Sequence, residues 1–500
     1  MGEPQPVSKA DLIAGLPPVW PDDSLRSQIA ALAAASGLCV AALDDDPTGT
    51  QTVHDIWVLT AWEPQDLKWA LEQGEPAIYV LTNSRSLPLE QAQALNREVA
   101  ANLAQAAREA GRPLLVVSRS DSTLRGHFPG EVDALSEALE TAWGRAFDGL
   151  CLIPFFPEGG RYTVYNTHYV QEGERLVPAG QTPYAQDPVF GYTRSNLPQW
   201  VEEKTGGRVP ADHVATISIE LLRQDGPQAV AERLESVRGG QVVVVNAAAD
   251  RDLEVFALGL LQAYAAGKRF LFRTAASFVK VAAGISDRSL LSAEDLRARR
   301  PAGSEAAVTD GAAPGGTALG GTARNGLIVF GSFVPKSSAQ LERVLALPGV
   351  LPVELSVAEA LDEALRGPAI ERLAQAANAG LRAGQDVLLY TSRQIVTAAS
   401  KQDNLSIGQQ VSSALMEVVR RVEVEPSFVI GKGGITSSDL ATAGMGVRAA
   451  RVLGQVRPGV PVWQLGLGSR WPGVPYVVFP GNVGEAGTVA EVVELLRQKI

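Results

Sequence analysis

The stretch from Ser118 to Gly126 concentrates side chains that could bind a small polar ligand. It holds two arginines, Arg119 and Arg125, together with Asp121 and four hydroxyl side chains. The forked guanidinium of arginine suits a carboxylate or a phosphate, while aspartate and serine suit the hydroxyls of a sugar. The alternative is structural, with Arg119 and Arg125 forming salt bridges to a nearby acidic turn.

That acidic turn contains three consecutive carboxylates, Asp44, Asp45 and Asp46, at the end of a short apolar run. Burying an uncompensated carboxylate costs several kcal/mol, so the run should open into a crevice instead of continuing through a core. Pro47 and Gly49 then favour a change of chain direction. An acidic surface turn is the alternative if these three residues are considered alone.

Three glycine-rich turns in the second half of the chain could bind a phosphate. They are Gly431–Asp439, Pro480–Thr488 and a turn that begins at Gly331 and Ser332. Glycines let the backbone approach a phosphate closely, and the free N–H groups at a helix start favour an anion. The first turn lacks the spacing of a Walker A motif. A glycine-rich domain with a purely structural role is the alternative.

Alternating strands and helices must position these polar stretches. Apolar runs that end in polar turns and are followed by helical patterns predict a parallel α/β sheet. In the first half the predicted strands are 37–43, 77–81, 114–117, 150–155, 214–219, 242–245 and 270–272, and the predicted helices are 24–35, 91–110 and 131–143. Because ligands bind beyond the carboxyl ends of the strands in such sheets, the recurring Asp, Asn, Ser, Thr and Arg at those ends predict a ligand crevice.

Two segments break this rhythm. Residues 156–207 are rich in aromatics, Pro and Gly, with a β-hairpin predicted within 162–177, and form an ordered excursion near the site or at a subunit contact. Residues 302–324 have the Gly/Ala-rich composition of a flexible linker. Beyond it the predicted strands are 327–330, 387–390, 428–430, 462–465 and 476–479, and the predicted helices are 338–345, 369–383, 407–421, 438–453 and 489–499.

Composition narrows the class of protein. Five hundred residues with 46% hydrophobic content are enough for two domains, each with its own core. The net charge of −11 argues against nucleic acid or an anionic membrane as partner. Two cysteines in apolar runs, Cys39 and Cys151, read as buried hydrophobes and favour a reducing compartment. Without a signal peptide or an apolar run of about 20 residues, the expectation is a soluble, cytoplasmic protein.

At the level of motifs, the chain resembles the four-carbon acid sugar kinase family, also called DUF1537. Asp45–Gly49 resembles its DDxTG motif and Ser120–Gly126 its SDSTLRG motif. The matches continue in order along nearly the whole chain, with Gly160-Arg161, Asp187-Pro188, Gly331-Ser332 with Gln340, Gly433–Ser437, and Gly481–Gly484.

The resemblance implies an α/β fold with two domains, each with a mostly parallel sheet flanked by helices, and a ligand cleft between them. The expected division is a sugar-acid-binding domain at 1–300, a flexible linker at 301–325 and a nucleotide-binding domain at 326–500. The implied activity is ATP-dependent phosphorylation of a hydroxyl of an erythronate-, threonate- or oxo-tetronate-like acid. The alternative is a non-catalytic sensor that binds a sugar acid and a nucleotide.

The resemblance also assigns roles to residues. Asp45 and Asp46 are the candidate catalytic residues, and the substrate is expected to contact Thr48, Arg119, Asp121, Ser122 and Arg125. The expected nucleotide contacts are Ser332, Gly433, Gly434, Ile435, Thr436, Ser437, Gly481, Asn482 and Gly484. ATP and Mg²⁺ are the expected cofactors, with the metal ligands unassigned, and a homodimer is considered. Lys432 and Arg273 are alternatives for the γ-phosphate, and the substrate's stereochemistry and the phosphorylated hydroxyl stay open.

Overall fold

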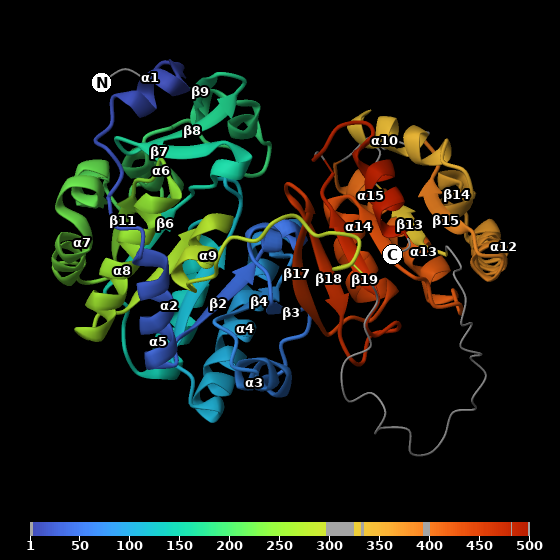
Figure 1. Ribbon diagram of the computed structural model, residues 1–500, viewed down its shortest axis with the longest axis horizontal. Helices are drawn as coiled ribbons and strands as arrows, with labels where there is room; N and C mark the ends of the chain where they lie inside the picture. The colour runs from blue at the N-terminus through green and yellow to red at the C-terminus, as the bar shows by residue number, and fades with distance from the viewer. Residues whose placement is uncertain (1–3, 297–324, 332–334, 394–400, 482, 499–500) are drawn as a thin grey trace. The chain divides into compact units, whose positions relative to one another are not determined.

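The computed structural model describes residues 4–296, 325–331, 335–393, 401–481 and 483–498. The chain divides into two compact units, Met1–Arg288 and Ser289–Ile500. Most of the predicted linker, and the predicted site residues Ser332 and Asn482, lie outside the described residues. Figure 1 shows both units as layers of helices on sheets.

The N-terminal unit is built on a parallel sheet with strand order β10-β11-β6-β12-β5-β2-β4-β3. Its strands are β2 (Cys39–Asp44), β3 (Ile56–Leu59), β4 (Ala77–Leu81), β5 (Leu114–Arg119), β6 (Gly149–Ile153), β10 (Ala215–Ile217), β11 (Gln241–Val245) and β12 (Phe270–Thr274). Its helices are α1 (Lys9–Ala14), α2 (Leu25–Ser36), α3 (Pro64–Glu72), α4 (Leu89–Ala110), α5 (Gly130–Trp143), α6 (Leu197–Lys204), α7 (Gly226–Glu235), α8 (Asp250–Ala265) and α9 (Ala276–Ala282). Helices α3, α4 and α5 pack in sequence, as do α7, α8 and α9.

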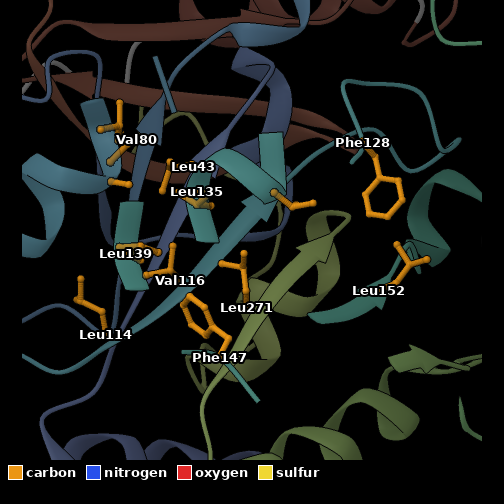
Figure 2. Close-up of a cluster of buried hydrophobic side chains, with 14 of the residues drawn as sticks. Leu43, Val80, Leu114, Val116, Phe128, Leu135, Leu139, Phe147, Leu152 and Leu271 are labelled. Carbon is orange, nitrogen blue, oxygen red and sulfur yellow. The ribbon is translucent and has the colours of Figure 1, made fainter. Parts of the chain in front are cut away.

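Buried aliphatic side chains hold the central strands against the helices. Figure 2 shows Leu43 of β2 and Val116 of β5 among the leucines Leu135 and Leu139 of α5. Burying each such side chain contributes about 1.5–3 kcal/mol relative to leaving it in water. Because β2 lies between β4 and β5 in this rigid layer, the polar turns that follow these three strands are brought together.

The predicted hairpin within 162–177 is confirmed as part of a small antiparallel sheet. Its order is β1-β9-β8-β7, from β1 (Val7–Ser8), β7 (Arg161–Val164), β8 (Thr167–Glu172) and β9 (Arg175–Pro178).

The C-terminal unit has a sheet with strand order β17-β18-β19-β16-β13-β15-β14, parallel from β19 to β14 and antiparallel at β17 and β18. Its strands are β13 (Leu327–Phe330), β14 (Val350–Leu355), β15 (Asp386–Thr391), β16 (Val429–Lys432), β17 (Ala449–Arg457), β18 (Val460–Leu465) and β19 (Pro475–Phe479). Its helices are α10 (Pro335–Leu345), α11 (Val357–Leu361), α12 (Glu363–Arg382), α13 (Lys401–Arg420), α14 (Gly434–Asp439) and α15 (Thr488–Leu496).

One helix prediction is wrong. The helix predicted at 438–453 ends at Asp439, followed by a wide turn at Leu440–Gly444 and then the strand β17. Along β17 partly exposed and buried residues alternate, which is the period of a strand, and the strand pairs with β18 in an antiparallel register. The alanine-rich composition hid this alternation.

Candidate functional site

The site in the N-terminal unit begins with Asp44, the last residue of β2. Its carboxylate is buried and accepts a hydrogen bond from Arg119 Nη1 at 3.1 Å. Gly49 closes the turn over it, because a Cβ on Gly49 would lie 1.7 Å from Asp44 Oδ2. Burial raises the pKa of Asp44 to about 7, and its neighbours Asp45 and Asp46 add to the rise while Arg119 opposes it. Asp44 and Arg119 therefore form an internal ion pair that fixes the turn.

The carboxylate of Asp45 is occupied by other side chains. Arg85, which follows β4, donates from both Nε and Nη2 to the two Asp45 oxygens. Ser120 donates from Oγ to Asp45 Oδ2 at 2.6 Å. Only 4% of the Asp45 side chain is exposed. Asp45 thus ties the polar ends of β2, β4 and β5 to one another.

Asp46 is the more open carboxylate, with 26% of its side chain exposed. Its Oδ1 accepts a hydrogen bond from the backbone N–H of Thr48 at 2.9 Å, and Arg85 Nη1 lies 3.3 Å from its Oδ2. Burial opposes ionisation, but the Arg85 charge and the Thr48 hydrogen bonds hold the pKa of Asp46 below its usual value. Asp46 is therefore an ionised carboxylate that a ligand can reach.

The loop after β5 presents Asp121 and Arg125. Arg125 Nε donates to Asp121 Oδ2 at 2.8 Å, and Thr123 Oγ1 donates to the same oxygen. Although burial opposes it, the nearby Arg85 and Arg125 charges lower the pKa of Asp121 strongly. Asp121 is thus ionised and can accept hydrogen bonds from hydroxyl groups.

The excursion at 156–207 packs on this loop. His168 Nε2 lies 2.7 Å from the carbonyl oxygen of Ser122, and Tyr192 Oη donates to the carbonyl of Thr123 at 2.7 Å. Arg125 Nη1 lies 3.7 Å from Asp187 Oδ2. The excursion therefore lies near the site. This is one of the two positions expected from the sequence, the other being a subunit contact.

Arg273, at the end of β12, lies beneath the same loop and is 1% exposed. Its Nη2 donates to the carbonyl of Arg125 at 3.0 Å, and its Nε and Nη1 have no acceptor among the described residues. Burial lowers its pKa, while the Asp45 and Asp121 carboxylates oppose this. Arg273 therefore supports the loop from below.

In the C-terminal unit, the turn after β16 is built from backbone and hydroxyl groups. Ser437 donates from Oγ to the carbonyl of Gly431 at 2.8 Å, and Tyr476 donates to the carbonyl of Ser437 at 2.7 Å. A Cβ on Gly331 would lie 2.2 Å from Thr436 Oγ1, so the turns after β13 and β16 meet. Gly433 and Gly434 open α14, and Ile435 is 63% exposed.

Lys432 and Gln340 join this turn to the one after β19. Lys432 is buried and donates to the carbonyls of Pro480 and Gly481. Gln340 Nε2 donates to the carbonyls of Val483 and Glu485 at 3.1 and 3.0 Å. Burial and the Lys336 charge lower the pKa of Lys432 to about 7. Three strand ends of this unit thus converge on one glycine-rich surface that includes Gly481.

The structure brings most of the sequence-predicted residues together within each unit. Thr48 donates to Asp46, and Asp121 and Arg125 pair with each other on the loop after β5. The carbonyl of Ser122 faces His168. The structural alternative holds for Arg119, which pairs with Asp44, but not for Arg125, which pairs with Asp121 and Asp187. Sequence reasoning missed Arg85, although it follows β4 in the same strand-end pattern that singled out the other turns. It also gave no role to Glu131, a buried residue of α5 that accepts a hydrogen bond from Asn96 at 3.2 Å.

Among the described residues, no group of three or more His, Cys, Asp or Glu side chains could hold a metal ion. Both cysteines are buried and free, as predicted. No helix in the described part of the chain is long and apolar enough to cross a bilayer.

Comparison with known proteins gives two family models that match in tandem. Residues 40–282 match a model described as a sugar-binding N-terminal domain, and residues 327–489 match one described as a nucleotide-binding C-terminal domain.

Named relatives agree with these models. The chain is 30% identical to a D-erythronate kinase of Heliobacterium modesticaldum over 203 residues, which is 39% of this chain and 40% of the relative's length. It is 26% identical to a 3-oxo-tetronate kinase of Cupriavidus necator over 83% of this chain and 84% of that protein.

The fold also matches a solved structure, a Haemophilus influenzae protein of the DUF1537 family. The TM-score is 0.58 at 18% identity, covering 91% of this chain and all of that one. This likeness shows the shared fold, and the tandem domain models with the relatives' names show that the chain belongs to the four-carbon acid sugar kinase family.

Proposed function

We propose that the protein is an ATP-dependent kinase that phosphorylates a hydroxyl of a four-carbon sugar acid. The observation that carries this proposal is the cluster at the ends of β2, β4 and β5. There an ionised and partly exposed carboxylate, Asp46, is held beside Asp121 and Arg125 by a network of buried ion pairs. Such a cluster supplies a proton acceptor and ligands for hydroxyl groups within one site.

In the proposed reaction, Asp46 orients the attacking hydroxyl and accepts its proton. The hydroxyl oxygen then bonds to the γ-phosphorus of ATP, the bond to the β-phosphate oxygen breaks, and ADP leaves. Asp45 holds Arg85 and is a positioning residue, because only 4% of its side chain is exposed, against 26% for Asp46. Asp121 and Arg125 bind the polar groups of the acid, with Thr48 and Ser122 at its border.

The nucleotide is proposed to bind the glycine-rich surface of the C-terminal unit. The backbone at Gly433–Ser437, at Gly481 and at Gly484 would face the phosphates or the ribose. Lys432 stabilises the surface from within, since its ammonium group already donates to two carbonyls.

Mg²⁺ is expected to arrive with the nucleotide. This ion commonly takes one or two carboxylates together with phosphate oxygens, and since Asp46 is assigned to the hydroxyl proton, the phosphates would supply most of its ligands. When bound, the ion would neutralise charge on the phosphates.

A coupled ADP-release assay with four-carbon sugar acids tests the proposal. Each erythronate, threonate and oxo-tetronate isomer is offered with ATP and Mg²⁺ to the full-length protein. The proposal expects ADP release that depends on one of these acids. Tight binding of acid and nucleotide by calorimetry without ADP would instead identify a sensor.

A further inference from the structure

Arg161, the first residue of β7, has no carboxylate partner among the residues that the structure describes. Its side chain is partly buried, and it forms no hydrogen bond or ion pair through its guanidinium with any described residue. Its Nε is buried without an acceptor. A half-buried cation without a counterion is unfavourable, because water is partly removed and no anion replaces it.

Tyr184 places this charge beside the substrate-binding arginine. The guanidinium carbons of Arg161 and Arg125 lie 5.5 and 5.2 Å from the centre of the Tyr184 ring. Two like charges therefore lie at the same aromatic ring and repel each other. An anion bound between the two guanidinium groups would relieve this repulsion.

Of the two arginines at the Tyr184 ring, only Arg125 has carboxylate partners among the described residues. Arg125 is neutralised by Asp121 and Asp187, at 2.8 and 3.7 Å, whereas Arg161 has no partner in the described chain. Arg273 also keeps two guanidinium nitrogens without acceptors. Burial, with the Arg161 and Arg273 charges adding to it, lowers the pKa of His168 to about 3. His168 is therefore neutral and adds no further positive charge beside Arg161.

We propose that Arg161 binds the carboxylate of the sugar acid, together with Arg125, and selects acids over neutral polyols. This inference rests on the proposed function and adds a specificity-determining residue to it. The acid would lie with its carboxylate at Arg161 and Arg125 and a hydroxyl at Asp46. The site would then have an acidic end where the proton is removed and a basic end where the substrate is recognised.

The test compares Arg161→Gln and Arg161→Lys with wild type, using the active acid and the tetritol in which its carboxyl is reduced to an alcohol. Loss of one charge-assisted hydrogen bond predicts a rise in KM for the acid of about 10- to 100-fold in Arg161→Gln. The KM values for ATP and for the tetritol, and kcat for the acid, should change by less than about threefold. Arg161→Lys keeps the charge without the forked guanidinium, so its KM for the acid should lie between those of wild type and Arg161→Gln.

Arg175→Gln is the matched control, since Arg175 lies on β9 of the same small sheet and, among the described residues, its Nη2 donates to the carbonyl of Pro6. It should leave every parameter unchanged. An unchanged KM for the acid in Arg161→Gln would overturn the inference, as would a rise in the KM for ATP alone, which would make Arg161 a nucleotide ligand.

A failure of the proposed function would look different. If the wild type releases no ADP with any acid, calorimetry still decides the inference. Tighter acid binding by wild type than by Arg161→Gln supports it, and equal binding or no binding contradicts it.

Discussion

The strand ends of the two units use different chemistry. In the N-terminal unit, charged side chains from β2, β4 and β5 pair with one another, as in Asp44 with Arg119 and Asp45 with Arg85. In the C-terminal unit, the corresponding turns meet through glycine, hydroxyl and carbonyl groups. The ammonium group of Lys432 donates hydrogen bonds to two backbone carbonyls.

This difference matches the ligands proposed for each unit. A small polyhydroxy acid offers a few groups at fixed positions, which side chains of defined geometry can distinguish. A nucleotide offers phosphates that backbone N–H groups can approach, provided that no side chain stands between them. Substitutions should therefore act through charge in one unit and through space in the other.

The largest effect is expected for Asp46→Asn in the N-terminal unit. Removing the proton acceptor should lower kcat by about 10²- to 10⁴-fold while the protein stays folded. Steady-state ADP release with the active acid measures this, with Asp133→Asn as the control at an exposed carboxylate paired to Arg208. Full activity in Asp46→Asn would show that Asp46 is not the proton acceptor.

Arg85→Met tests whether the charge network holds the turns together. Removing Arg85 leaves the buried Asp45 carboxylate uncompensated, which should destabilise the N-terminal unit by about 3–5 kcal/mol. Arg97→Met breaks a surface pair with Glu137, whose side chains are 47% and 67% exposed, and should cost about 0–1 kcal/mol. Urea unfolding of both variants measures the difference, and equal losses would contradict a buried network.

Gly331→Ala tests the role of space in the C-terminal unit. The new Cβ would meet Thr436 Oγ1 and displace the glycine-rich turn, so affinity for a non-hydrolysable ATP analogue should fall about tenfold. Affinity for the sugar acid should not change. Gly408→Ala on α13, where a Cβ meets no atom within 4 Å, is the control. Calorimetric titration of each variant with both ligands would refute this account if acid binding fell instead.

The pH dependence of stability should have opposite signs for one buried group in each unit. In the N-terminal unit, burial and the Asp45 charge raise the pKa of Glu131 to about 7, so between pH 4.5 and 7 the folded state keeps a proton that the unfolded state has lost. Wild-type stability should therefore fall as pH rises through this window. The gain in stability from Glu131→Gln should grow across it, on the order of 3 kcal/mol.

Lys432 in the C-terminal unit should behave in the reverse way. Its folded pKa of about 7 lies below the usual 10.5, so between these values the unfolded state holds the extra proton and stability rises with pH. Any stability gained by Lys432→Met should therefore shrink as pH rises from 7 to 10.5. Urea unfolding across the two pH windows measures both variants, and parallel slopes for the two would contradict the assignment.

Local sequence pattern was enough to predict much of this molecule. The strands Ala77–Leu81 and Leu327–Phe330 were predicted with the bounds that the structure shows, because each is a short apolar run between polar turns. The strand β17 was missed because its alternation of small and polar residues resembles an alanine-rich helix. The Asp45 and Asp121 turns were found because unusual charge follows a buried strand.

The pairings within the site could not be read from the sequence. Which arginine neutralises which aspartate depends on strand order, and only the placement of β2 between β4 and β5 brings Arg85 to Asp45 and Arg119 to Asp44. The contact of Tyr184 with Arg125 and Arg161 likewise joins residues from separate segments. Motif resemblance named Arg161 and Asp187 but gave neither of them a partner.

Phosphorus NMR of the full-length protein with ATP, Mg²⁺ and the active sugar acid tests the central claim most directly. The account predicts that a phosphomonoester signal of the acid grows in step with ADP, and that both disappear in Asp46→Asn. Release of inorganic phosphate in place of the phosphorylated acid, or an unchanged spectrum despite bound acid, would contradict it.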